Sequence, residues 1–274
     1  MSVVAETLAV SRSHLHAGST GATRLRGPYS KPEDAAFLPL IREIVDARPT
    51  YGYRRITALL NRRFRSEGKP AVNAKRVLRI LQRHDLTLER HTTRRPGRTH
   101  DGVVMALRSN LRWCSDHLEI HARSGEVVRI LFVLDACDRE IIAWSAVANA
   151  GISGEMVRDL MVTAVERRFG STKAPHKLEW LSDNGSAYIA RETADMATAL
   201  GLTLLFTPVR SPESNGMSEA FVKTLKRDYA RVTLLPDASA ILGLLPAWIE
   251  DYCEIHPHSA LKFRSPREFI RLSA

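Results

Sequence analysis

Two turn-rich runs decide the fold of this chain: Leu181-Ser182-Asp183-Asn184-Gly185-Ser186 and Ser211-Pro212-Glu213-Ser214-Asn215-Gly216-Met217-Ser218-Glu219. Each run combines turn-forming residues with a carboxylate, and 35 residues lie between Asp183 and Glu219. The first run follows the short apolar segment 178–181, so we expect Asp183 at the carboxyl end of a strand. In an open α/β sheet, this is the end at which ligand-binding groups are presented.

Glu219 belongs to a different kind of element. Pro212 and Asn215-Gly216 precede it, and the pattern that follows has a helical period, which places Glu219 in the first turn of a helix. Glu219, Lys223 and Lys226 fall on one face of that helix. The apolar residues fall on roughly the opposite face: Phe221, Val222, Leu225 and Tyr229. The charged face is either a functional surface or an ordinary solvated one.

A pair of divalent cations requires a third acid. Asp116 lies in segment 111–120, which alternates as a strand does, whereas Asp135 ends the next apolar segment and is a rival for the same role. Carboxylates on separate rigid elements can converge on Mg²⁺, which prefers oxygen ligands. In two-metal phosphoryl chemistry, the ions clamp the attacking and leaving oxygens.

These motifs together resemble a known family. Trp113-x-x-Asp116, then Asp183-Asn184-Gly185-Ser186, then Ser211 to Glu219 is similar to the Asp-Asp-Glu integrase core of retroviral integrases and bacterial insertion-sequence transposases. The nearer resemblance is to OrfB-type insertion-sequence transposases, through segments 222–229 and 256–261. The similarity runs from about Thr50 to the C-terminus.

The resemblance implies a fold and a set of site residues. The implied fold is α/β: a ribonuclease-H-like mixed sheet flanked by helices, preceded by a small all-α helix-turn-helix-like domain. It favours Asp116 over Asp135 and implies that Asp116, Asp183 and Glu219 are catalytic and hold two Mg²⁺ ions, with Mn²⁺ as a substitute. The residues implied in DNA contact on the last helix are Lys223, Lys226 and Arg227. Asn184 and Asn215 are expected to shape the two turns.

The implied function is a DNA transposase that cleaves the ends of an insertion element and joins them to a target by metal-dependent hydrolysis and strand transfer. The implied partners are DNA (terminal inverted repeats and target DNA), further copies of this chain in a homo-oligomer, and an upstream-frame protein supplied as a fusion. Two alternatives remain open. One is a non-catalytic DNA-binding accessory or regulatory subunit, and the other is a ribonuclease-H-type nuclease without joining activity.

Composition limits the class of protein. The 274 residues are 44% hydrophobic, which is sufficient for a sizeable core. No apolar run approaches the roughly 18 residues of a membrane span, and no secretory signal pattern opens the chain. Cys114, Cys137 and Cys253 lack C-x-x-C spacing, which indicates a reducing compartment. We therefore expect a bacterial cytoplasmic protein associated with the nucleoid and without a membrane partner.

The net charge of +10 is concentrated in one part of the chain. Residues 51–100 contain fourteen Lys and Arg against three acidic residues, a local charge of +11. A segment this basic indicates a polyanion partner. From Pro32 to His84, which overlaps this basic segment, the apolar residues have a helical period that predicts three helices, the third capped by Asn73. The expected DNA-binding residues in it are Arg54, Arg55, Lys75, Arg76 and Arg79. The third helix either docks in a groove of DNA or contacts phosphates alone.

We divide the chain into five segments. They are an N-terminal helix fragment and linker (1–33), a helix-turn-helix-like DNA-binding domain (34–88), a basic linker (89–109), the integrase catalytic core (110–232), and a C-terminal helix and tail packing on the core (233–274). In the first segment, Val3 to Leu15 is expected to form one short helix. The core is expected to follow the order of three strands, helix, strand, helix, strand, helix. The role of His256 stays open.

Overall fold

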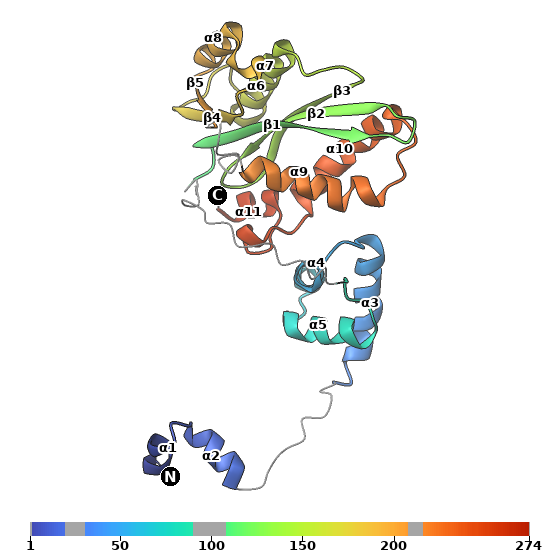
Figure 1. The fold of residues 1–274 in the computed structure, drawn as a ribbon, viewed down its shortest axis with the longest axis vertical. Helices are drawn as coiled ribbons and strands as arrows, with labels where there is room; N and C mark the ends of the chain where they lie inside the picture. Colours follow the sequence, from blue (N-terminus) through green and yellow to red (C-terminus); the bar gives the residue numbers. More distant parts are fainter. Residues whose placement is uncertain (1, 20–30, 90–107, 208–215, 274) are drawn as a thin grey trace. The chain divides into compact units, whose positions relative to one another are not determined.

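The computed structural model describes residues 2–19, 31–89, 108–207 and 216–273 (Figure 1). The chain forms two units, residues 1–40 and 41–274, and the boundary between them falls inside one helix. Two of the predictions, most of the basic linker (residues 90–107 of 89–109) and the turn at Asn215, lie outside the described residues.

The N-terminal unit contains two short helices where one was expected. Helix α1 spans Ser2–Thr7 and helix α2 spans Arg12–Ser19. They are separated at Ala9, whose φ of 50° is incompatible with a continuing right-handed helix. The prediction of one helix from Val3 to Leu15 is therefore wrong, and most of the expected linker from Gly18 to Ser30 lies outside the described residues.

The three helices predicted between Pro32 and His84 are confirmed. They are α3 (Asp34–Ala47), α4 (Tyr53–Ser66) and α5 (Ala74–Arg83). Asn73 caps α5 as expected, because its side-chain oxygen accepts the backbone N–H of Lys75 at 2.8 Å. The apolar stripes of α4 and α5 are buried, with Ile56 and Leu60 on α4 and Val77 on α5.

A five-stranded sheet forms the centre of residues 108–273. The strands are β1 (Arg112–His121), β2 (Val127–Asp135), β3 (Ile141–Ala148), β4 (Leu178–Ser182) and β5 (Leu202–Phe206). Their order across the sheet is β3-β2-β1-β4-β5. The first three strands, joined by short connections, pair antiparallel, and β4 and β5 add in parallel. The expected mixed sheet of the ribonuclease-H-like order is confirmed.

Helices cover both faces of this sheet (Figure 1). One face carries α6 (Gly154–Phe169), α7 (Ser186–Ile189) and α8 (Arg191–Ala199). The other carries α9 (Gly216–Asp228), α10 (Ala238–Glu254) and α11 (Pro266–Ser273). Short 3₁₀ turns span Ala230–Val232 and Ser259–Leu261. Successive strand residues point to opposite faces, so each strand contributes to both layers.

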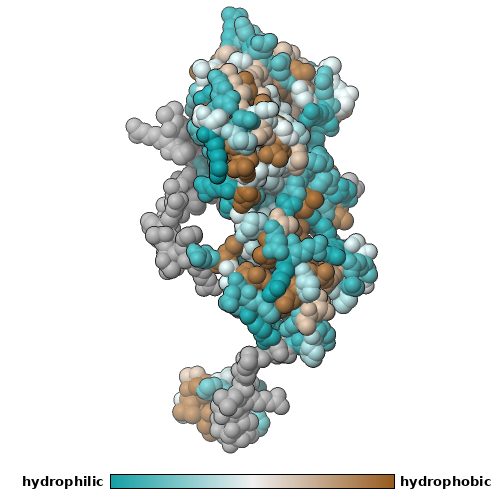
Figure 2. Space-filling view, turned by 90° about the vertical axis from the view of Figure 1, so that its right-hand side faces the viewer, coloured by the Kyte–Doolittle hydropathy of each residue, from teal (hydrophilic) through white to brown (hydrophobic). Residues whose placement is uncertain are grey.

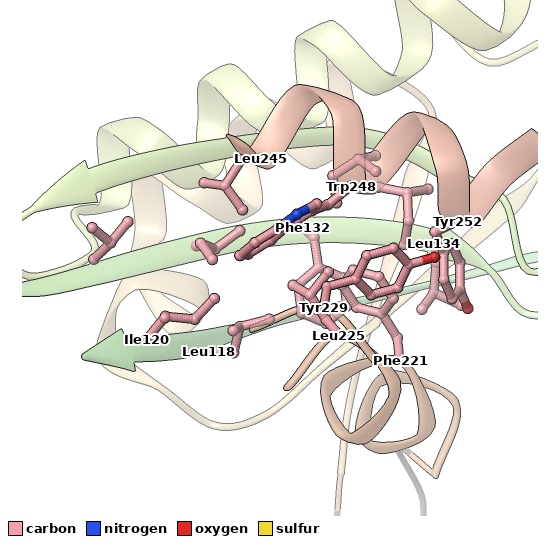
Figure 3. Close-up of a cluster of buried hydrophobic side chains, with 14 of the residues drawn as sticks. Leu118, Ile120, Phe132, Leu134, Phe221, Leu225, Tyr229, Leu245, Trp248 and Tyr252 are labelled. Carbon is pink, nitrogen blue, oxygen red and sulfur yellow. The ribbon is translucent and has the colours of Figure 1, made fainter. Parts of the chain in front are cut away.

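The layer on the α9 side explains why α9 lies where it does. Phe221 packs edge-on against Phe132 of β2, with ring centroids 4.6 Å apart, and against Tyr252 of α10 at 4.8 Å. Figure 3 shows this cluster, in which side chains of β1, β2, α9 and α10 meet. The apolar face predicted for the helix of Glu219 is therefore the buried face. Burying large aromatic side chains holds α9 against the sheet.

Among the described residues, no helix combines the length and apolar character that crossing a membrane would require. In the view of Figure 2, hydrophilic side chains are interspersed with smaller hydrophobic areas.

Candidate functional site

The pairing of β1 with β4 brings two of the three predicted acids level with each other. The parallel register joins Cys114 to Leu181, and each predicted acid lies two residues further along the chain, Asp116 within β1 and Asp183 directly after the end of β4. Cys114 and Leu181 both belong to the core layer on the α9 side. Because side chains alternate with a period of two, Asp116 and Asp183 face the same side of the sheet, the side that α9 covers.

The electrostatics of Asp116 connect the three acids. Burial raises the pKa of Asp116 above its ordinary value, and the negative charges of Asp183 and Glu219 raise it further. A backbone hydrogen bond from His117 at 2.8 Å opposes this shift. The side chain of Asp116 keeps 23% of its exposure. Asp116 is therefore a solvent-accessible carboxylate beside two other carboxylates, with no Lys or Arg ion pair recorded among the described residues.

Asp183 sits in a tight turn that needs glycine. Its carboxylate accepts the backbone N–H of Gly185 at 3.1 Å, and a β-carbon at Gly185 would lie only 3.0 Å from that same oxygen. Asn184 donates its amide to the carbonyl of Thr207 at 2.7 Å. The turn after β4 is thereby tied to the end of β5, so Asn184 supports the turn as expected.

Glu219 is held on its own helix. It lies in the first turn of α9, where the positive end of the helix dipole favours a carboxylate. Lys223, one turn later, donates to it at 2.7 Å, and the Glu219 side chain is 40% exposed. This pair occupies the oxygen that would otherwise be available to a cation.

The donor set fits a hard divalent cation. Three carboxylates on β1, β4 and α9 supply oxygen ligands of the type that Mg²⁺ selects. Within the described ranges, however, no three His, Cys, Asp or Glu side chains are already arranged to hold a metal ion. The sheet sets Asp116 and Asp183 level with each other, whereas one oxygen of Glu219, Oε2, is paired with Lys223.

Sequence patterns did not reveal a buried hydroxyl pair behind the site. Ser115 on β1 and Tyr188 on α7 share a hydrogen bond of 2.8 Å, and both residues are buried. Burial raises the pKa of Tyr188, and the charges of Asp116 and Asp183 raise it further, so the phenol stays protonated. The pair ties β1 to the helix that follows the Asp183 turn. The only sequence signal for it is the position of Tyr188 soon after the Asn-Gly turn.

The rival acid, Asp135, lies in a closed environment. It is fully buried and accepts backbone N–H groups from Asn110 at 2.6 Å and Cys137 at 2.7 Å. Burial, reinforced by the charge of Asp138, raises the pKa of Asp135 to about 6. Arg168 covers this pair, forming an ion pair with Asp138. No open face remains for a substrate phosphate, so the geometry favours Asp116 as the third acid.

The predicted DNA-binding residues fall into two groups. Arg54, Lys75 and Arg79 are exposed on α4 and α5, and Arg76 and Lys226 are half-buried. Arg55 and Arg227, in contrast, are engaged with the buried carboxylate of Asp228, at 2.9 Å and 2.6 Å.

Asp228 joins the helical segment to the core at the far end of the helix that carries Glu219. It also accepts the hydroxyl of Thr50 at 2.6 Å. Next to it, Tyr51 hydrogen-bonds the Nδ1 atom of buried His256 at 2.7 Å. The role of His256 is thus structural: it packs and hydrogen-bonds where α4 meets the core.

Known families and solved structures resemble this chain. An integrase core domain family matches residues 106–212 and a second one matches residues 200–266. An HTH-like domain family matches residues 32–95. Among solved structures, a chain of the simian T-cell lymphotropic virus intasome is similar, with 16% identity, a TM-score of 0.48, and coverage of 84% of this chain and 73% of that chain. The Mos1 transposase catalytic domain has 14% identity and a TM-score of 0.45, covering 52% and 71%.

The sequence relatives are much closer. An uncharacterized protein of insertion element IS136 from Agrobacterium fabrum is 67% identical over 69% of this chain and 96% of its own length. The transposase InsD of insertion element IS2 from Escherichia coli is 46% identical over 100% of this chain and 92% of its own length. A resemblance of this extent, over a chain that matches both an HTH-like domain and an integrase core, identifies the family. The chain belongs to the OrfB-type insertion-sequence transposases.

Proposed function

We propose that Asp116, Asp183 and Glu219 form the catalytic site of this transposase and hold two Mg²⁺ ions, for which Mn²⁺ can substitute. The supporting observation is the register of β1 and β4, which sets two acids level on the face covered by the helix of the third. The raised pKa of Asp116, to which both other acids contribute, supports the same grouping.

The residues of the chain would act mainly by positioning. When bound, the metal would neutralise the carboxylates, polarise a DNA phosphate and lower the pKa of an attacking water. Asp116 would present its oxygens from the middle of β1 and Asp183 from the hydrogen-bonded turn after β4, and Glu219 would add a ligand from α9 once it is released from Lys223. Lys223 is then free to approach a DNA phosphate. No Ser or Tyr nucleophile is required, because water and then a DNA 3′-hydroxyl perform the two attacks.

The overall reaction has two stages. In cleavage, water attacks a phosphodiester at the end of the element, the P–O3′ bond breaks, and a 3′-hydroxyl is released. In strand transfer, that hydroxyl attacks a target phosphodiester and displaces its 3′ oxygen. Both stages act on phosphates, so the same acids serve in each.

The proposed partners follow from this reaction. The substrates are the terminal inverted repeats of the element and target DNA. Joining two ends requires at least two active sites, so we propose a homo-oligomer, with an upstream-frame protein supplied as a fusion. The three cysteines are free thiols, which supports a location in the reducing cytoplasm, at the nucleoid.

We propose a division of labour along the chain. Residues 34–88 bind DNA through Arg54, Lys75, Arg76 and Arg79, and residues 110–232 catalyse. Residues 233–274 brace the core through α10. Segment 89–109 links the DNA-binding part to the core, and segment 1–33 is a helix fragment and linker that precedes both.

A plasmid assay tests the proposal. Supercoiled DNA carrying both ends of the element is incubated with the purified chain in Mg²⁺, Mn²⁺ or EDTA, and nicked and joined products are separated on gels. We expect Asp183→Asn and Glu219→Gln to lose cleavage and keep DNA binding. Asp195→Asn is the matched control, because Asp195 is an exposed carboxylate on α8 with only a 3.9 Å contact to Arg191.

Each other outcome excludes a specific element of the proposal. Full cleavage by Asp183→Asn would show that the assigned acids are wrong. Nicking without joined product would indicate a nuclease of the ribonuclease-H type. DNA binding by the unmodified chain without any cleavage, even when fused to the upstream-frame protein, would indicate an accessory subunit.

A further inference from the structure

A groove outside the catalytic site lies between helix α4 and the loop before α11. Its volume is about 380 Å³. One wall is a single face of α4, since its lining residues recur at helical spacing from Arg54 to Arg65. The opposite wall is the loop Lys262–Arg264 together with Glu268. We refer to it as the α4 groove.

The α4 groove carries an excess of positive charge. Its cations are Arg54, Arg62, Arg65, Lys262 and Arg264, and its single acid is Glu268. Glu268 is saturated, accepting from Arg62 at 2.8 Å and from Arg65 at 3.2 Å. Among the described residues, no carboxylate forms an ion pair with the other three cations.

The backbone of the loop is held in a strained form. Lys262 and Phe263 are consecutive non-glycine residues with φ of 56° and 61°. Each residue in this region costs on the order of 1 kcal/mol or more, and such strain persists only where the surroundings impose it. Here, the N–H of Phe263 donates to the carbonyl of His258 at 2.8 Å, and the N–H of His258 donates to the carbonyl of Arg264 at 3.0 Å. This closed loop directs Lys262 and Arg264 to the wall opposite α4.

The neutral polar side chains of the groove are already used. Asn61 donates its amide to the carbonyl of Val72 at 3.0 Å and accepts the N–H of Val72 at 2.7 Å. Thr57 donates its hydroxyl to the carbonyl of Tyr53 at 2.7 Å. Both polar atoms of the Asn61 amide are thus engaged with the backbone of Val72. The remaining polar groups of the groove are mainly cations, and cations placed along a helix and a loop match the phosphates of a nucleic-acid backbone.

From these features, we propose that the α4 groove clamps the sugar-phosphate backbone of duplex DNA without reading its sequence. The clamp rests on the proposed function, since DNA is the substrate of the catalytic site. It combines α4 with a loop about two hundred residues later, and it leaves base recognition to other elements such as α5. Contacts of this kind set the register and strength of binding, and each one adds to the salt dependence.

Salt titration of DNA binding tests the clamp. Fluorescence anisotropy measures the Kd for labelled DNA duplexes in EDTA, at salt concentrations from low to high. The proteins compared are the full chain and its variants Lys262→Asn, Arg264→Gln and Arg54→Gln. Two duplexes of equal length are used, one with the element end and one of random sequence. Asn tolerates the left-handed backbone at position 262, so Lys262→Asn removes charge without adding strain. Thermal unfolding confirms that each variant is folded.

We expect each substitution to weaken both duplexes by the same factor, roughly threefold to tenfold near 0.1 M salt, and to lower the log–log salt slope by about 0.9. Arg123→Gln is the matched control, because Arg123 is exposed outside the groove and has no recorded side-chain ion pair, and we expect it to bind like the unmodified chain. Unchanged affinity and slope in all three variants would overturn the clamp, as would a loss confined to the element-end duplex.

The proposed function fails separately from the clamp. An unmodified chain that binds DNA and does not cleave it, even when fused to the upstream-frame protein, refutes the catalytic proposal and leaves the clamp standing. A chain that cleaves, with variants that bind as the unmodified chain does, refutes the clamp alone. If the unmodified chain binds no duplex at all, the clamp is wrong.

Discussion

Two groups of carboxylates lie on the same sheet and have opposite character. Asp116 and Asp183 keep part of their exposure, and among the described residues neither forms an ion pair with a Lys or Arg; the Nδ1 atom of His117 lies 3.9 Å from the Asp116 carboxylate. Asp135 and Asp138, where β2 ends, are fully buried and are covered by Arg168. The first group is partly open to solvent, as the proposed metal site requires, and the second is a closed structural brace.

The difference shows how a rival site can be rejected. Asp135 and Asp116 both fit a strand-end carboxylate in sequence, and both have a raised pKa. Burial is the main cause of both shifts, and the second cause differs. The pKa of Asp116 is also raised by acids on other elements, Asp183 and Glu219, whereas the pKa of Asp135 is also raised by Asp138, three residues away. A perturbed pKa marks a functional site only when its cause is an open constellation of groups.

The largest expected effect is on catalysis and compares the two acids directly. We expect Asp116→Asn to lower strand cleavage by on the order of 10³-fold or more, because several kcal/mol of metal-dependent stabilisation are lost. Asp135→Asn is expected to destabilise the fold without changing the chemistry, so its cleavage activity should fall only as far as the folded fraction of the protein falls. Plasmid nicking and thermal melts of both variants provide the measurement. Cleavage retained by Asp116→Asn and lost by folded Asp135→Asn would reverse the assignment.

The second effect is on stability, at the closed brace. Arg168→Met leaves Asp138 buried without its ion pair, so we expect the free energy of unfolding to fall by about 3–5 kcal/mol. Urea denaturation measures this loss. Arg158→Met is the control, because Arg158 on α6 pairs with Glu192, which is 78% exposed. Equal stability of the two variants would mean that the brace contributes nothing.

The third effect is a pH dependence in the buried region around Asp228. Burial lowers the pKa of His256 and lowers the pKa of His258 to about 3. The positive charges of nearby arginines lower both pKa values further. The folded chain therefore keeps both rings neutral where the unfolded chain binds protons, so stability falls as pH drops below about 6.5. From pH 7 to pH 5, each histidine is expected to cost about 2 kcal/mol.

The variant His258→Phe isolates one of these two contributions. It removes one titrating ring and a buried nitrogen that lacks a hydrogen-bond partner. We expect the loss of unfolding free energy between pH 7 and pH 5 to be smaller by about 2 kcal/mol than in the unmodified chain. Urea denaturation at the two pH values measures it, and an unchanged difference would contradict a neutral His258.

The smallest effect separates two roles of Arg55. Arg55→Gln removes one of two arginines from Asp228 and leaves Arg227 in place, so we expect a loss of about 1 kcal/mol in unfolding free energy. DNA affinity measured on the same variant tests its predicted phosphate contact independently. A lower slope of log affinity against log salt would confirm that contact. A loss of stability with unchanged DNA affinity would show that Arg55 serves only to pair with the buried Asp228.

Much of the fold was predictable because its signals are local. Alternation placed the strands, helical spacing placed α9 and its buried Phe221, and Asn73 marked the start of α5. The break at Ala9 was missed because nothing in a short helical pattern indicates a single residue with positive φ. The α4 groove was missed for another reason, since its two walls are nearly two hundred residues apart.

By itself, the sequence determined the chemistry available to this protein: the three acids, their order, the basic segment and the family to which they belong. The tertiary structure decided which of the groups are used together. The register of β1 and β4 sets Asp116 level with Asp183. Burial closes Asp135 off from solvent. Asp228 pairs with Arg55 and Arg227, two arginines that the sequence predicted to contact DNA. These outcomes depend on long-range pairing and on access to water, which local patterns do not encode.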